Sequence, residues 1–122
     1  MSEKILLFEM PPQESAKIKR LASQMRIRTK IVNVSEYGKT IGQIAETDEI
    51  KNDAADSTAG FRPADSLIVM CGLTEKHMDR LLFSLRRDNI RAGYKAILTP
   101  SNSTWSVSKM YAHMELEHKL TH

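Results

Sequence analysis

A single cysteine stands where its thiol could act as a nucleophile. Cys71 ends the apolar run of residues 66–71, and Gly72, Leu73 and Thr74 then lead into a segment with helical spacing. A helix N-terminus favours a thiolate and lowers the pKa of a nearby thiol. Cys71 could therefore serve a cysteine-dependent enzyme or a redox sensor. The favoured interpretation is a small apolar residue that closes a strand, because the chain has one cysteine and no histidine can be placed beside it.

A polar turn is the second feature that could carry chemistry. Residues 95–105 read Lys-Ala-Ile-Leu-Thr-Pro-Ser-Asn-Ser-Thr-Trp, which predicts a short strand, a turn and the start of a helix. The side chains of residues 101–104 can bond the local backbone or a ligand. Such a turn suits an anion or a polar ligand. It is also an ordinary connection, in which Trp105 anchors the last helix on the core.

Both features are expected at one edge of the sheet. A right-handed helical crossover between strands 66–71 and 94–98 makes the two strands parallel, so their C-terminal ends lie on the same side. The candidate ligand-binding residues at this edge are Cys71, Gly72, Thr74, Thr99, Asn102 and Trp105. No catalytic signature accompanies them, so we predict no catalytic residue and no cofactor.

Histidines near the chain end suggest a metal site at first sight. His113, Glu117, His118 and His122 have helical spacing, but a zinc site needs about three or four converging ligands. We interpret these residues as a solvated tail and predict no metal. His77 lies near an apolar stripe and is interpreted as a partly buried structural histidine.

Nucleic-acid binding is a weaker hypothesis. The formal net charge is +3, and six basic residues of the first predicted helix and the following segment could contact phosphates: Lys17, Lys19, Arg20, Arg26, Arg28 and Lys30. A solvated helix face is the commoner meaning of such a pattern. An RNA-recognition sheet needs aromatic side chains on its central strands, and residues 66–71 contain none.

Composition indicates one globular domain over residues 1–122. The chain is 41% hydrophobic and 27% charged, with no apolar run near the roughly 20 residues that a membrane span requires. The N-terminus lacks the features of a signal peptide, and one cysteine suits a reducing compartment, so we expect a cytoplasmic protein. Self-association is left open.

Periodicity predicts four strands and at least three helices. The strands are residues 4–10, 28–34, 66–71 and 94–98; the helices are 12–25, one from Thr74, and a last one capped by Ser106. Residues 40–46 have enough apolar positions for one or two helical turns. A mobile loop is predicted at 47–63, with a frayed C-terminal tail. The predicted core includes Ile68, Val69, Leu81, Leu82, Leu85 and Ile97.

Two α/β topologies fit this order of elements. The preferred one is a ferredoxin-like βαββαβ antiparallel sheet, order 4-1-3-2, with an extra C-terminal helix, because the segment 40–46 is so short. The alternative is a small doubly wound parallel sheet, order 2-1-3-4, which better suits strands that are apolar on both faces. Both halves of the chain follow strand–helix–strand, but no internal repeat is convincing.

The second half resembles a known family. Val69-Met-Cys-Gly-Leu73, an amphipathic helix, Lys95-Ala-Ile-Leu-Thr-Pro-x-Asn-x-x-Trp105 and Glu117-His118 together are similar to a bacterial family known as domain of unknown function 3783. The resemblance extends over the chain and is specific from Val69 onward. It implies a small cytoplasmic α/β protein without an assigned activity. Ser101 stands where a second threonine is expected, and it keeps the hydroxyl.

Three functions follow from these observations. The first is a non-enzymatic binding or regulatory module for a small polar or anionic ligand, or for a protein partner. The second is a cysteine-dependent enzyme or redox sensor that uses Cys71. The third is weak nucleic-acid binding through the basic first helix.

Overall fold

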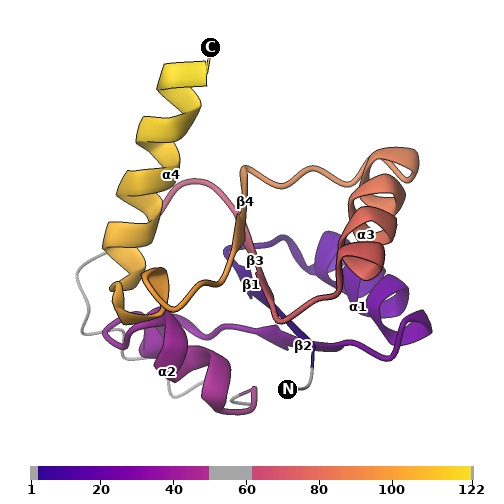
Figure 1. Cartoon of the computed structure of the whole chain (residues 1–122), viewed down its shortest axis with the longest axis horizontal. Coiled ribbons are helices and arrows are strands. Elements are labelled where there is room, and N and C mark those ends of the chain that lie inside the picture. The colour runs from indigo at the N-terminus through magenta and orange to yellow at the C-terminus, as the bar shows by residue number, and fades with distance from the viewer. Residues whose placement is uncertain (1–2, 50–61, 122) are drawn as a thin grey trace.

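The computed structural model describes residues 3–49 and 62–121. Most of the predicted mobile loop therefore lies outside the described residues. Within them, strands alternate with helices, and two of the helices are single 3-10 turns, η1 and η2 (Figure 1). The elements are β1 (Lys4–Phe8), α1 (Pro12–Gln24), β2 (Arg28–Ile31), η1 (Val34–Glu36), α2 (Ile41–Glu46), β3 (Leu67–Cys71), α3 (Glu75–Arg87), β4 (Tyr94–Ile97), η2 (Asn102–Thr104) and α4 (Val107–Thr121).

The four strands form one open mixed sheet in the order β2-β1-β3-β4. β1 and β2 are parallel, β3 and β4 are parallel, and the two central strands β1 and β3 are antiparallel. The preferred ferredoxin-like order 4-1-3-2 is therefore wrong, although its antiparallel neighbours β1 and β3 are confirmed. The alternative had the right strand order, but its all-parallel orientation is wrong because of the β1–β3 pair.

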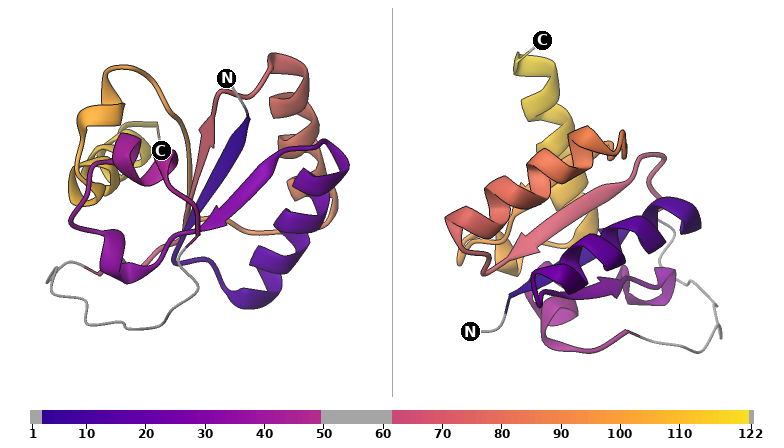
Figure 2. Two further views of the ribbon diagram at one scale, coloured as in Figure 1. Left: turned by 90° about the horizontal axis from the view of Figure 1, so that it is seen from below. Right: turned by 90° about the vertical axis from the view of Figure 1, so that its right-hand side faces the viewer.

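Burial on both faces of the central strands explains why the ferredoxin-like prediction failed. All five residues of β1 and all five of β3 are buried, so each side of the sheet needs a covering layer. The helices α1 and α3 cover one face, and α2 with α4 covers the other (Figure 2). The short α2 was discounted as too small, yet with α4 it completes the second layer. None of the helices described here is long and apolar enough to cross a membrane.

The capping signals of the helices mostly act as predicted. Thr74 Oγ1 accepts the backbone N–H of His77 at the start of α3, and Ser106 Oγ accepts that of Lys109 in the first turn of α4. The capping box at Thr40 gives α2 a defined start. α4 extends to Thr121, and fraying of its end stays a prediction.

The predicted core is confirmed at most positions. Ile68, Val69, Leu81 and Leu85 are buried, while Leu82 is only half-buried. Ile97 is 48% exposed, so its predicted burial is wrong. The reason is that β4 is an edge strand, which leaves one flank of its side chains without a neighbour.

The two halves of the chain repeat one βαβα unit. β1 and β3 begin at Lys4 and Leu67, and α1 and α3 begin at Pro12 and Glu75, a separation of 63 positions in both cases. The positive backbone φ angles recur at the same separation: Glu9 (53°) with Gly72 (68°) after the first strand, and Arg26 (59°) with Asn89 (56°) after the helix. The repeat therefore exists in backbone geometry, although different residue types adopt it.

An approximate twofold axis relates the two units. Leu6 lies opposite Val69 at the centre of the antiparallel β1–β3 pair. Near the same axis, Thr40 before α2 and Ser106 before α4 form an isolated antiparallel bridge. Gly42 allows the close approach of η2 to α2, since a Cβ there would lie 2.8 Å from the carbonyl oxygen of Ser103. The units thus meet both in the sheet and in the layer above it.

Candidate functional site

A cleft of about 470 Å³ opens at the edge of the sheet where β3 and β4 end. Its size falls within the usual range for small-ligand sites. It lies among the ends of all four strands, α2 and the polar turn that contains η2. The lining residues are Lys4, Arg28, Gly42, Ala45, Glu46, Cys71, Gly72, Leu98, Thr99, Pro100 and Ser103.

The mixed sheet determines which residues meet in this cleft. Because β3 and β4 are parallel, Cys71 and Leu98 emerge on the same side, as the sequence predicted. Because β1 is antiparallel to β3, Lys4 pairs with Cys71, and the parallel β2 brings Arg28 beside Lys4. The first residues of β1 and β2 thereby join the last residues of β3 and β4.

Lys4 is the most constrained charged group of the cleft. Lys4 is 5% exposed, and its Nζ donates hydrogen bonds to the carbonyl oxygens of Ala45 (2.9 Å) and Thr47 (2.8 Å). Burial lowers the pKa of Lys4, and the nearby positive charges of Arg28 and Lys30 lower it further, against a smaller opposing effect of Asp48. An ammonium has three N–H groups, so two carbonyls leave one donor for another acceptor.

Cys71 is enclosed in the wall of the cleft. The residue is 7% exposed, and burial raises the pKa of its thiol to about 11, although the positive charge of Lys4 acts in the opposite direction. The thiol is therefore protonated at neutral pH. This environment is that of an unreactive packing cysteine rather than an activated nucleophile.

Many polar groups of the turn at residues 99–104 form hydrogen bonds within the turn. Asn102 Oδ1 accepts the backbone N–H of Thr99, Thr99 Oγ1 accepts that of Asn102, and Asn102 Nδ2 donates to the carbonyl of Ile97. These bonds fix the turn above α2. Thr99 lines the cleft, whereas Asn102 shapes the turn and does not line it.

Of the remaining predicted site residues, one lines the cleft and two lie outside it. Gly72 lines the cleft and has the positive φ that favours glycine. Thr74 caps α3 outside the cleft. Trp105 is half-buried at the start of α4, where its ring lies 4.7 Å from that of His113 and under the ammonium of Lys109 at 5.1 Å. Three of the six candidates, Cys71, Gly72 and Thr99, thus meet in the cleft.

Sequence reasoning missed the contribution of the first unit. Lys4 and Arg28 begin strands that looked unrelated to the edge after β3, and Glu46 belongs to a helix that was discounted. A lysine at the start of an otherwise apolar strand was the available signal, since all of β1 is buried. The ferredoxin-like prediction also sets β1 antiparallel to β3 and so implies this position for Lys4. The position of Arg28 depends on the β1–β2 pair, which that prediction lacks.

The twofold-related edge is filled by the chain itself. There Glu9 occupies the position equivalent to Gly72, and its Oε2 accepts bonds from Tyr37 Oη (2.7 Å) and Arg62 Nε (3.1 Å). Tyr37 follows η1, just as residues beside the cleft belong to η2. The carboxylate of Glu9 is therefore bound by two donors at one edge. At the other edge Gly72 has no side chain, and the cleft is open there.

His113 and His77 each lie beside a carboxylate, whereas His122 lies outside the described residues. His113 Nε2 lies 3.0 Å from Glu117 Oε1 on the surface of α4, and His77 Nδ1 lies 2.7 Å from Glu3 Oε2 at the start of α3. Within residues 3–49 and 62–121, no group of three or more potential metal ligands converges.

Comparison with known protein families assigns the second βαβα unit to a family. The family model of a domain of unknown function, DUF3783, matches residues 66–120. This part of the chain is a DUF3783 domain. The DUF3783 match begins one residue before β3 and ends within α4, so it coincides with the second βαβα unit. The cleft combines that domain with residues of the first unit. No curated protein and no solved structure matches the chain.

Proposed function

We propose that the chain is a non-enzymatic module that binds a small anion, a carboxylate or a phosphate, in the cleft at the end of β3 and β4. The observation that carries the proposal is the buried ammonium of Lys4. In the described structure its hydrogen-bond partners are two neutral carbonyls, and burial, followed by the charges of Arg28 and Lys30, lowers its pKa. Lys30 already pairs with Glu36 and Arg28 with Asp48, so a bound anion would serve as the charged partner of the Lys4 ammonium.

The rest of the cleft suits the same ligand. Arg28 adds a second cation beside Lys4, while Ala45, Leu98 and Pro100 offer apolar surface for a carbon skeleton. The hydroxyls of Thr99 and Ser103 also line the cleft, although Ser103 Oγ already donates to the carbonyl of Pro100. The held carboxylate of Glu9 at the equivalent edge is a model, within one chain, for an anion in this position.

Thermal denaturation with inorganic phosphate and a set of mono- and dicarboxylates tests the proposal. A ligand that binds the native state alone raises the melting temperature, and the shift grows with the logarithm of the ligand concentration once this exceeds the dissociation constant. We expect a shift that grows with ligand concentration in the native sequence and is lost in Lys4→Met. Lys76→Met is the matched control, because Lys76 is exposed on α3 and its loss changes the net charge equally.

The pH dependence of binding adds a second readout. The anion binds the charged form of Lys4, so affinity falls as the pH rises through the lowered pKa of this group, below the ordinary lysine value of 10.5. Equal shifts in Lys4→Met and in the native sequence would contradict the proposal. If Lys4→Met fails to fold, Arg28→Gln replaces it, since that side chain is 59% exposed.

A further inference from the structure

Charged side chains of both signs line the cleft. Lys4 and Arg28 are its cations, and Glu46 is its anion. Gly42, Ala45 and Glu46 are spaced i, i+3 and i+4 along α2, so they share the face of this helix that borders the cleft. Glu46 is exposed, and its carboxylate forms no hydrogen bond or ion pair with any residue that the structure describes.

Within the described residues, Lys4 and Glu46 are the charges of the cleft that lack a charged partner. Arg28 Nη1 lies 3.8 Å from Asp48 Oδ1, whereas Lys4 Nζ donates to two neutral carbonyls and retains one N–H. Those carbonyls belong to the residues on either side of Glu46, so the two opposite charges are neighbours at the end of α2. A second negative charge on a ligand, as in a phosphate dianion or a dicarboxylate, would be repelled by Glu46.

The hydroxyl groups of the cleft add a donor and an acceptor. Thr99 Oγ1 accepts a backbone N–H of the turn, and its own O–H donates to no described residue, so it is available to a ligand. Ser103 Oγ donates its proton to the carbonyl of Pro100 and keeps lone pairs that can accept a hydrogen bond. Ser103 packs against Gly42 of α2. Donors therefore lie at the strand ends, and acceptors lie beside α2.

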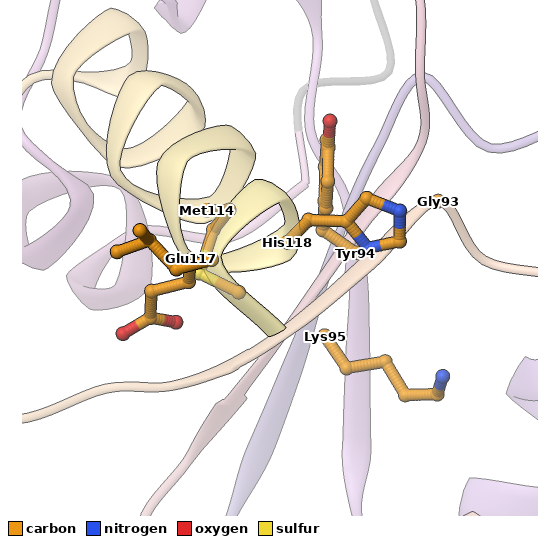
Figure 3. Close-up of a pocket in the computed structure, with 7 residues that line it drawn as sticks. Gly93, Tyr94, Lys95, Met114, Glu117 and His118 are labelled. Carbon is orange, nitrogen blue, oxygen red and sulfur yellow. The ribbon is translucent and has the colours of Figure 1, made fainter. Parts of the chain in front are cut away.

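Another hollow of similar size lacks such an arrangement. It measures about 480 Å³ and lies between β4 and the outer half of α4 (Figure 3). Its charged or titratable lining residues Lys95, Glu117 and His118 are all exposed, and the side chains of Lys95 and Glu117 extend in different directions. A small ligand would meet no buried charge there, so the cleft is the better-defined charged site.

On the basis of the proposed function, we infer that the ligand of the cleft is an α-amino acid with an aliphatic side chain, bound as the zwitterion. The ligand is thus a carboxylate that also carries an ammonium, rather than any small anion. Its carboxylate would meet the Lys4 ammonium and the Thr99 hydroxyl, while its ammonium would meet the Glu46 carboxylate. The adjacent opposite charges match the neighbouring positions of Lys4 and Glu46, and the apolar side chain would pack on Leu98 and Pro100.

Isothermal titration calorimetry with ligands that differ in one charged group tests this assignment. Leucine is compared with isocaproate, which lacks the amino group, and with isoamylamine, which lacks the carboxylate. Valine, isovalerate and isobutylamine form a second set. We expect at least one of these amino acids to bind at least about tenfold more tightly than both of its analogues, because hydrogen bonds to charged groups contribute more than neutral ones.

Glu46→Gln separates the choice of ligand from the proposed function. It removes the charge that binds the ammonium, so leucine should bind about as weakly as isocaproate, whose own affinity should stay the same or rise. Lys4→Met should weaken both ligands, because it removes the partner of the carboxylate. Asp79→Asn is the matched control: Asp79 is exposed on α3, which covers the other face of the sheet, and its loss of charge should leave both affinities unchanged.

The possible failures give different results. If isocaproate binds as tightly as leucine, or if Glu46→Gln leaves the ratio of their affinities unchanged, the zwitterion is ruled out while anion binding stands. If neither amino acids nor carboxylates nor inorganic phosphate bind, the proposed function fails as well. Leucine binding that survives Lys4→Met would contradict both. Circular dichroism melts verify that each variant is folded.

Discussion

At the scale of single residues, Cys71 shows how position in the fold decides chemistry. It follows a buried strand and precedes a helix, a placement that in sequence could favour a thiolate. In the structure α3 begins only at Glu75, and burial dominates, raising the pKa of the thiol to about 11. The hypothesis of a cysteine-dependent enzyme or redox sensor therefore has little support from its environment.

Cys71 should consequently react slowly with iodoacetamide in the native protein. Its thiolate is scarce at neutral pH, so alkylation at pH 7 to 8 should be at least about tenfold slower than in the unfolded chain. The reaction has one target, since the chain contains a single cysteine. Mass spectrometry of timed samples measures the rate. Rapid labelling of the folded protein below pH 7 would revive the redox-sensor hypothesis.

A buried ion pair fixes the junction of β2, η1 and α2. Lys30 Nζ lies 3.0 Å from Glu36 Oε1, both side chains are 1% exposed, and Lys30 also donates to the carbonyl of Ile44 and to Thr47 Oγ1. Removing one member leaves the other charge buried without its main partner. Such changes typically cost about 3–5 kcal/mol.

Lys30→Met should therefore lower the free energy of unfolding by about 3–5 kcal/mol. The double variant with Glu36→Leu should recover much of that loss, because it also removes the stranded carboxylate. Lys19→Met is the control: that lysine pairs with Glu49 while 41% exposed, so its loss should cost about 1 kcal/mol or less. Urea denaturation curves measure all three. A double variant no more stable than Lys30→Met would argue against this account.

At the scale of elements, α3 is held by a narrow stripe of side chains. Leu81 and Leu85 are buried against β1 and β3, Leu82 lies at the margin, and Phe83 faces solvent. The burial of the side chain thus falls stepwise from Leu81 through Leu82 to Phe83. The stability contributed by this helix should be concentrated in the two buried leucines.

Leu81→Ala should lower the free energy of unfolding by about 2–5 kcal/mol, because it removes a fully buried side chain and leaves a cavity. Leu82→Ala should cost less, and Phe83→Ala should stay within about 0.5 kcal/mol of the native sequence. Denaturant unfolding followed by circular dichroism gives the three values. A comparable loss at Phe83 would mean that α3 packs in a different rotation.

At the scale of the whole molecule, the two βαβα units depend on each other. β1 and β3 pair along their full length and are buried on both faces, so either unit alone would expose a strand edge and two apolar surfaces. Together the units bury these surfaces around the approximate twofold axis. The DUF3783 domain is one half of that arrangement.

Two separately expressed chains, residues 1–55 and 56–122, should therefore assemble with one another. Each alone should be unfolded or self-associated, and an equimolar mixture should restore the cooperative melt of the native protein. Light scattering gives the stoichiometry, and near-ultraviolet circular dichroism reports the environment of Trp105. Val69→Lys in the second chain is the control, because it places a charge at the centre of the β1–β3 pair and should prevent assembly. A monomeric half with its own cooperative melt would contradict the interdependence.

The sequence by itself determined the elements and part of the site. Apolar runs, helical stripes and caps at Thr74 and Ser106 are local signals, so they specified the order of strands and helices. The ends of β1 and β2 were predicted two and three residues too late, at residues 10 and 34. The right-handed crossover through α3 was enough to place Cys71, Gly72 and Thr99 at one edge, because that rule links neighbouring elements of a chain.

Only the tertiary structure decided which outer strand pairs with which central strand. The antiparallel β1–β3 pair is part of the preferred prediction, but β2 pairs with β1 and β4 with β3, and no local pattern encodes that choice. β4 lies at the edge of the sheet, as in both predicted orders, and Ile97 on it is exposed although its residue type predicts burial. The β1–β3 pair brings Lys4 to Cys71, and the β1–β2 pair brings Arg28 beside it. The polar turn thereby becomes one wall of a cleft that Lys4, Arg28 and Glu46 also line.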